Sequence, residues 1–158
     1  MTDHQALDLL IKKLRTRQQT VGFAESCTGG LLSATLASHA GVSDVFKGAV
    51  VSYANQAKED LLQVSPITLK LMGAVSDLTV RQMAQGVRKQ LKCEWSVAIS
   101  GVAGPTGGTE EKPVGTVWFA ICGPDLESTE RKFFSGSRNE IQKQAVDYAI
   151  EFLLTEMN

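Results

Sequence analysis

Residues 20–41 read TVGFAESCTGGLLSATLASHAG, and this stretch indicates the class of fold. Its first part, 20–25, is short, apolar and partly β-branched, which favours a buried strand. Gly29 and Gly30 interrupt that pattern, and the next residues, LLSATLASHAG, are typical of a helix that ends near Gly41. The stretch therefore predicts a strand followed at once by a helix, which is the repeating unit of α/β proteins.

The alternation continues along the chain. Apolar spacing predicts a helix over 4–17, and further helices are expected from Asn55 to Leu62 with Asn55 as a cap, from Pro66, from a cap at Ser76 or Asp77, and from a cap at Ser137. Strands are expected at 46–54, 95–100, 115–122 and 128–134, the last two joined by the turn Gly123-Pro124-Asp125. Helices separate the first three strands, which implies parallel crossovers. We therefore expect a three-layer α/β/α sandwich on a five-stranded mixed, mostly parallel sheet.

Length and composition set limits on the class of protein. The 158 residues suit a single domain over 1–158, with 43% apolar and 21% charged residues. A net charge of −1 gives no electrostatic footprint for nucleic acid or an anionic membrane. Three widely spaced cysteines indicate neither a disulfide framework nor a zinc site, and no signal peptide or membrane span is recognised. We expect a cytoplasmic protein without nucleic-acid or membrane partners, and the sequence leaves a homo-oligomer open.

The segment AESCTGG, 24–30, holds the first candidate reactive side chain. It follows a strand and opens a helix, and ligands of open α/β sheets bind at that edge. A helix N-terminus there offers unpaired N–H groups and partial positive charge, so Ser26 would lie beside donors able to hold an oxyanion. Gly29 and Gly30 allow a ligand to approach the backbone. The alternative is that Ser26 is an ordinary helix cap.

The segment VVSYANQAK, 50–58, offers a base. Lys58 is expected on a short helix over the same sheet edge, where burial would lower its pKa and make it a general base. Only His4 and His39 could supply an imidazole, and neither is expected near that edge, so a lysine is the available base for Ser26. The alternatives are a solvated Lys58 and a Tyr53 that is merely a core aromatic.

The segment SGVAGPTGGTEEKPVGT, 100–116, carries five glycines and two prolines between strands. Loops so rich in backbone N–H groups can form anion-binding nests. The segment matches neither the GxxxxGK[ST] nor the GxGxxG phosphate motif, so ATP and dinucleotides are not indicated.

These three segments, extended to GAVVSYANQAK (48–58) and SGVAGPTGGTEEKPVGTVW (100–118), together with GAVS (73–76) and FSGSR (134–138), resemble the CinA C-terminal domain, also called the nicotinamide-nucleotide amidase family. The resemblance runs in order over nearly the whole chain. It implies hydrolysis of nicotinamide mononucleotide to nicotinate mononucleotide and ammonia by a serine and a lysine, which fall on Ser26 and Lys58. Thr28 and Tyr53 occupy family site positions, and neither metal nor cofactor is required.

The resemblance and the three segments together define a substrate site. We expect Ser26, Lys58, Thr28 and Tyr53 to be catalytic, and substrate contacts to come from Cys27, Gly29, Gly30, Ser100, Gly101, Gly104, Gly107, Gly108, Thr109 and Arg138. The glycine-rich loop would seat the 5′-phosphate, with Arg138 or Lys112 as counter-charge. Two other functions stay open: a nucleotide-binding module that does not cut, and an interaction protein of DNA uptake or repair, which the near-neutral charge disfavours.

Overall fold

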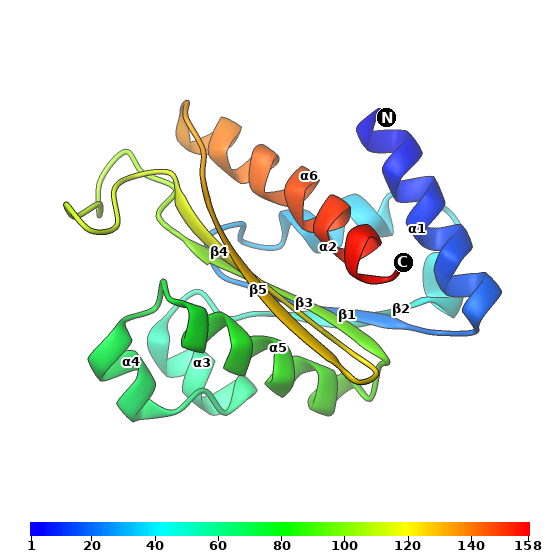
Figure 1. Cartoon of the computed structure of the whole chain (residues 1–158), viewed down its shortest axis with the longest axis horizontal. Helices are drawn as coiled ribbons and strands as arrows, with labels where there is room; N and C mark the ends of the chain where they lie inside the picture. The colour runs from blue at the N-terminus through cyan, green and yellow to red at the C-terminus, as the bar shows by residue number, and fades with distance from the viewer.

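The computed structural model describes residues 1–158 and is built on one five-stranded sheet (Figure 1). The strands are β1 (Val21–Glu25), β2 (Phe46–Val51), β3 (Trp95–Gly101), β4 (Thr116–Gly123) and β5 (Leu126–Phe133), in the order β2-β1-β3-β4-β5. β1 pairs in parallel with β2 and β3, whereas β4 runs antiparallel to β3 and β5. The expected mixed sheet is confirmed.

Helices cover both faces of this sheet, so the three-layer sandwich is also confirmed (Figure 1). One face carries α1 (Asp3–Arg17), α2 (Leu31–Ala37) and α6 (Arg138–Glu156); the other carries α3 (Asn55–Leu62), α4 (Pro66–Met72) and α5 (Asp77–Leu91). A 3₁₀ turn, η1 (Val42–Asp44), precedes β2.

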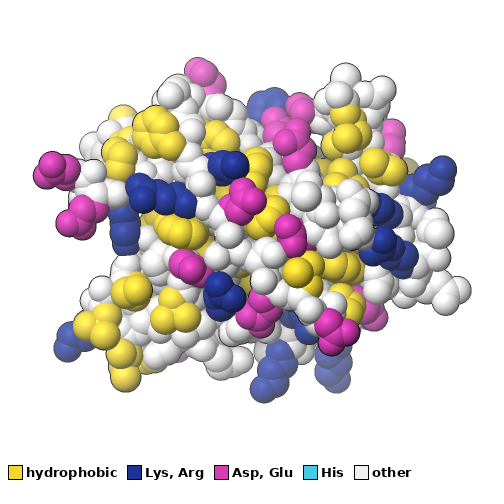
Figure 2. Space-filling view, in the orientation of Figure 1, with side chains coloured by type: hydrophobic (Ala, Val, Ile, Leu, Met, Phe, Trp, Pro, Cys, Tyr) yellow, Lys and Arg dark blue, Asp and Glu magenta, His cyan; other side chains and the backbone are white.

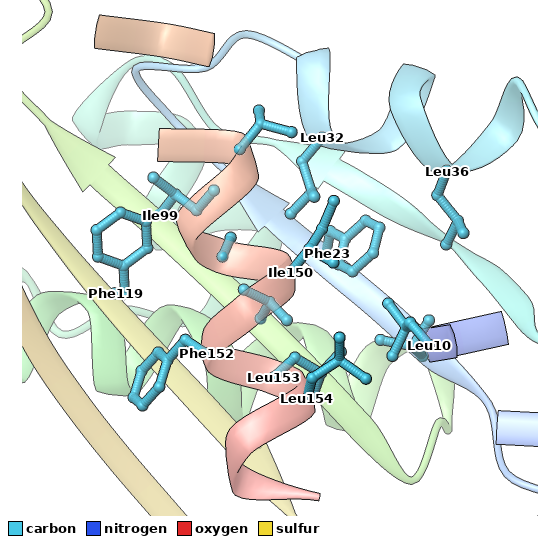
Figure 3. Close-up of a cluster of buried hydrophobic side chains, with 14 of the residues drawn as sticks. Leu10, Phe23, Leu32, Leu36, Ile99, Phe119, Ile150, Phe152, Leu153 and Leu154 are labelled. Carbon is cyan, nitrogen blue, oxygen red and sulfur yellow. The ribbon is translucent and has the colours of Figure 1, made fainter. Parts of the chain in front are cut away.

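Alternation along the strands supplies two separate cores, because successive side chains of a strand point to opposite faces. The larger core lies under α1, α2 and α6; in Figure 3, Phe23 of the sheet lies beside Leu32 of α2 and Ile150 of α6, and Phe119 lies beside Ile99 of the neighbouring strand. The smaller core lies under α3, α4 and α5 and includes the fully buried Met83. Each large apolar side chain buried in this way contributes about 1.5–3 kcal/mol.

Several element ends differ from the sequence-based expectation. Ser76 and Ser137 cap their helices as expected, accepting from the N–H groups of Thr79 and Glu140. The cap expected at Asn55 is wrong, because the N-cap of α3 is Ala54 and Asn55 already lies inside the helix. The second helix stops at Ala37 rather than near Gly41: Ser38 is its C-cap, and Gly41, with a positive φ, is the N-cap of η1.

Strand boundaries shift for similar local reasons. β2 ends at Val51 rather than at 54, because the next residues leave the sheet to start α3. The hairpin is tighter than expected: β4 runs through Gly123 and β5 already begins at Leu126. Between them, Pro124 and the left-handed Asp125 form the two central residues of a type II turn.

The parallel strands bring three connections to one edge. Ser26 follows β1, the Ser52–Lys58 connection follows β2, and the loop 102–115 follows β3. All three therefore emerge at the same carboxyl end of the sheet. None of the helices combines the length and the apolar character needed to cross a membrane.

Candidate active site

Ser26 sits where β1 turns toward α2, and it is not a helix cap. Its N–H donates to the carbonyl of Ile99 at 3.0 Å, which fixes the residue to the neighbouring strand β3. The N-cap of α2 is Gly30, which makes no side-chain capping bond. The cap interpretation of Ser26 is therefore excluded. The side chain is almost buried, with the residue 7% exposed.

Lys58 reaches this serine from the first turn of α3. Its Nζ lies 2.9 Å from Ser26 Oγ and donates to the carbonyls of Ser52 at 2.7 Å and Tyr53 at 3.3 Å. The residue is fully buried, and no carboxylate forms an ion pair with it. The interpretation of Lys58 as a solvated surface lysine is therefore wrong.

Burial without a counter-charge has a direct effect on the ammonium. It lowers the pKa of Lys58 from 10.5 to about 8, an effect that only a charged Cys27 thiolate would oppose. Burial also raises the pKa of Cys27 to about 12, so that the side chain stays a thiol at neutral pH. A usable fraction of Lys58 is consequently neutral near pH 7, which an ordinary lysine would not provide.

The three partners of Lys58 suit both of its protonation states. An ammonium has three donors, which match the Ser52 carbonyl, the Tyr53 carbonyl and Ser26 Oγ. A neutral amine has two donors and one lone pair. It can keep both carbonyls as acceptors and take a hydrogen bond from the Ser26 hydroxyl. The geometry thus allows a proton to move from Ser26 to Lys58 without rearrangement of the lysine.

Glu25 lies beside the pair as a fully buried carboxylate. It accepts from Thr28 Oγ1 at 2.7 Å, from the N–H groups of Leu32 at 2.9 Å and Ser33 at 3.0 Å, and from the Ser33 hydroxyl. These bonds satisfy the first turn of α2 and place negative charge there. The Thr28 hydroxyl is tied to this carboxylate.

The backbone donors of the turn fall into two groups. The N–H groups of Gly29 and Leu31 donate to carbonyls within the turn, at Ser26 and Thr28. Those of Cys27, Thr28 and Gly30 have no partner. Because buried N–H groups are almost always paired, the free donors of the buried residues Cys27 and Thr28 are notable. On the α6 side, Gln142 Nε2 donates to the Cys27 carbonyl at 2.9 Å.

Tyr53 and Arg138 meet at the same edge. Arg138 opens α6 and donates from Nη2 to the Tyr53 hydroxyl at 2.6 Å and from Nη1 to the Gly104 carbonyl at 2.7 Å. Tyr53 is 58% exposed, so it is not a core aromatic. The structure therefore brings together Ser26, Lys58, Tyr53, Gly104 and Arg138 from four connections that are distant in sequence.

The remaining predicted residues are occupied elsewhere or lie farther along the loop. Ser100 Oγ donates to the Ala74 carbonyl at 2.8 Å, and Lys112 Nζ donates to the Met72 carbonyl at 2.6 Å. Thr109 exchanges hydrogen bonds with the Lys112 backbone. A Cβ at Gly101 would approach the Thr116 carbonyl to 2.7 Å, so that glycine serves strand pairing. Gly107 and Gly108 lie in the exposed part of the loop, and none of these residues forms a hydrogen bond with the side chain of Ser26 or Lys58.

The larger surface pockets lie away from the Ser26–Lys58 pair. The five main surface pockets, of about 310 to 440 Å³, are not lined by Ser26 or Lys58. The 440 Å³ pocket lies at the opposite end of the sheet, between Cys93 and Leu126. Figure 2 shows a group of exposed apolar side chains over α4, where Ile67 and Leu71 are 68% and 73% exposed.

Sequence reasoning missed Ser52 and Gln142. Ser52 contributes only a main-chain carbonyl, which no sequence pattern reports. Gln142 lies 115 positions from the Cys27 carbonyl that it binds, so only the folded helix reveals the contact. The sequence indicates that α6 reaches the site through one residue, Arg138 at the start of that helix.

A buried serine hydrogen-bonded to a buried lysine, beside free backbone donors, defines the class of an α/β protein with a serine–lysine dyad at the carboxyl edge of its sheet. The family model of the CinA C-terminal domain matches residues 3–157, and the chain belongs to that family.

Proteins with known names and structures agree with this membership. A CinA-like protein of Prochlorococcus marinus is 46% identical over 155 residues, covering 96% of this chain and 36% of that protein. One of Pseudothermotoga lettingae is 44% identical, covering 93% and 36%. The chain thus spans about a third of the length of these relatives. The competence damage-inducible protein A of Klebsiella pneumoniae superimposes with a TM-score of 0.95 at 34% identity, covering 99% of this chain and 98% of that one.

Proposed function

We propose that this chain hydrolyses the carboxamide of nicotinamide mononucleotide, giving nicotinate mononucleotide and ammonia. The reaction class is supported above all by one observation: Lys58 Nζ lies 2.9 Å from Ser26 Oγ, and both side chains are buried. The substrate is the one that the family resemblance implies. The names of the relatives, CinA-like and competence damage-inducible protein, state no substrate.

The proposed chemistry follows the dyad. Neutral Lys58 takes the proton of Ser26 while Ser26 Oγ forms a bond to the carboxamide carbon. The oxygen that becomes negative is held by free N–H groups of the turn between Cys27 and Gly30. Lys58, now an ammonium, gives its proton to the departing amine, and ammonia leaves. Lys58 then takes a proton from water as the water oxygen bonds the acyl carbon of the ester, and it gives that proton to Ser26 Oγ as the bond between Oγ and the acyl carbon breaks.

The rest of the nucleotide would be bound along the edge. The exposed ring of Tyr53 offers a π face to the cationic pyridinium. Arg138 is the better candidate for the phosphate than Lys112, because it bonds Tyr53 while Lys112 is held at Met72. Binding energy from the phosphate can then be used to orient the carboxamide at Ser26.

The three cysteines are free thiols, which suits a reducing, cytoplasmic setting.

One assay tests this function. The pure chain is incubated with nicotinamide mononucleotide, ammonia is measured, and the nucleotide product is identified by mass. Ammonia released by the wild type and not by Ser26→Ala supports the proposal. Tight binding of the nucleotide without ammonia would instead favour the non-catalytic binding module.

A further inference from the structure

The turn after Ser26 contains one peptide group that is held by a side chain from another element. The Cys27 carbonyl accepts a 2.9 Å hydrogen bond from Gln142 Nε2, which lies on α6 one turn after Arg138. The N–H of the same peptide group belongs to Thr28 and has no partner. The neighbouring carbonyls of Ser26 and Thr28 accept only from N–H groups of the turn itself. Among the free donors, the Thr28 N–H is therefore the one whose peptide group is hydrogen-bonded by a side chain from another element.

Peptide geometry determines where that N–H points. The Cys27–Thr28 peptide bond is trans. In a trans peptide the C=O and the N–H point in opposite directions. Since the carbonyl points toward α6, the Thr28 N–H points away from it. α6 and α3 lie on opposite faces of the sheet (Figure 1), so an N–H directed away from α6 is directed toward the layer of α3, which carries Lys58.

We infer that Gln142 is a positioning residue, which holds the Cys27–Thr28 peptide so that the Thr28 N–H serves as an oxyanion donor. This inference rests on the proposed amide hydrolysis and deepens it. Ser26 cannot use its own N–H, which is bonded to Ile99, and the Gly29 N–H is bonded within the turn. The peptide groups that carry the Cys27 and Gly30 donors lack a side-chain anchor.

Two physical effects make the Gln142 bond useful to catalysis. A hydrogen bond accepted at the carbonyl polarises the peptide and strengthens its N–H as a donor. The bond also keeps the peptide from rotating, and a displacement of about 1 Å at a reacting group can cost about 100-fold in rate. Removing an oxyanion donor outright costs about 100- to 1,000-fold, so loosening one should cost about 10- to 100-fold.

The test compares Gln142→Met, which keeps the side-chain length and loses the donor, with Gln144→Met. Gln144 lies two residues along α6 and donates only to the Ser135 and Glu140 carbonyls, so it is the matched control. The first readout is the rate at which a fluorophosphonate modifies Ser26, followed by intact mass. In that reaction a Ser26 Oγ–phosphorus bond forms, fluoride leaves and Lys58 receives the proton, so no nucleotide is needed.

We expect Gln142→Met to lower both the labelling rate and kcat for the nucleotide about 10- to 100-fold, with KM changed less than about threefold. Gln144→Met should stay within about twofold of the wild type. The apparent pKa of labelling should not move, because Lys58 keeps its burial and its two carbonyl partners. Gln142→Glu, which retains volume but repels the Cys27 carbonyl, should show the same loss.

Labelling of Gln142→Met at the wild-type rate would overturn the inference. So would a loss of labelling rate that comes with a shifted apparent pKa, or with failure of both Gln142→Met and Gln142→Glu to fold. Absence of Ser26 labelling in the wild type would overturn it as well. Failure of the proposed function looks different. A wild type that is labelled at Ser26 but releases no ammonia from nicotinamide mononucleotide refutes the substrate and leaves the role of Gln142 to be decided by the labelling rates.

Discussion

The Arg138 guanidinium donates to the Tyr53 hydroxyl at 2.6 Å, and the two residues are 85 positions apart in sequence. Through this bond the first turn of α6 is joined to the connection between β2 and α3. A guanidinium that opens a helix beside an exposed aromatic ring is well placed for a phosphorylated ligand with a flat cationic base.

Arg138→Met should therefore raise KM for nicotinamide mononucleotide, by about 10- to 100-fold, since a hydrogen bond to a charged group contributes about 1.5–3 kcal/mol. Lys112→Met should change KM less than about threefold, because Lys112 is bound to the Met72 carbonyl. Nicotinamide riboside, which lacks the phosphate, should be as poor a substrate for the wild type as the nucleotide is for Arg138→Met. Equal cleavage of riboside and nucleotide would remove the phosphate site from the proposal.

Ser26→Ala should abolish turnover while the fold persists. Loss of a nucleophile lowers kcat by several orders of magnitude, on the order of 10⁴ or more. The substitution removes one hydroxyl and leaves the Ser26 N–H bond to Ile99 in place, so the melting temperature should change by only a few degrees. Steady-state ammonia release and a thermal melt check both statements. A variant that retains about a tenth of the wild-type rate would show that Ser26 is not the nucleophile.

The pH dependence of the rate should report Lys58. Because the base must be neutral and its pKa is lowered to about 8, kcat/KM should rise about tenfold per pH unit below that value and level off above it. Lys58→Arg should fold yet lose activity by several orders of magnitude, because a guanidinium does not deprotonate. A rate that is flat from about pH 6 to 9, or an active Lys58→Arg, would require another base.

The same lowered pKa predicts a change of stability with pH. The folded state disfavours the Lys58 ammonium, so burying it lowers the unfolding free energy. This loss is absent above the unfolded pKa of 10.5 and grows as pH falls toward about 8. Below about pH 8 it is constant. Relative to Lys58→Met, the wild type should therefore gain about 1–3 kcal/mol of unfolding free energy between pH 8 and 10.5. Denaturant unfolding at both pH values measures the difference. Parallel pH curves for the two proteins would mean that Lys58 titrates as an ordinary lysine.

Gly86 should resist substitution although it lies inside a helix. Ala is normally favoured over Gly in a helix such as α5 by about 1 kcal/mol. Here a Cβ at Gly86 would come within 2.0 Å of the Leu62 carbonyl at the end of α3. We expect Gly86→Ala to destabilise the protein by about 1–3 kcal/mol. It should also lower activity, because α3 carries Lys58; a stabilised, fully active variant would contradict this close approach.

The sequence predicted most of the architecture because its signals are local. Strand–helix alternation, the caps at Ser76 and Ser137, and the glycines after Ser26 each act within a few residues, and the structure shows them in place. The predicted ends of α2 and β2 are wrong because both depend on connections to other layers of the fold. The chain turns at Gly41 into η1, and after Val51 it leaves the sheet for α3.

The site was predictable only in part. Motifs pointed to Ser26 and Lys58, but whether Lys58 is buried depends on how α3 packs beneath the sheet, which no local pattern states. The glycine-rich composition of 100–116 predicts an anion-binding nest. In the structure, part of that composition serves packing instead, since a Cβ at Gly104 would lie 2.4 Å from Val114. Gln142 carried no signal because its partner is a main-chain carbonyl.

The register between β1 and β2 also determines how freely the dyad can move. The Ser52 N–H donates to the Glu25 carbonyl at 2.8 Å, so the residue before the nucleophile and a residue that anchors the lysine are linked by the last rung of a parallel ladder. Moving the Ser26 backbone away from Ser52 then requires fraying that ladder, and hydrogen exchange at the Ser26 and Ser52 amides should be as slow as within β1 itself. The reactive pair is thus assembled when the sheet folds, and a ligand meets it already aligned.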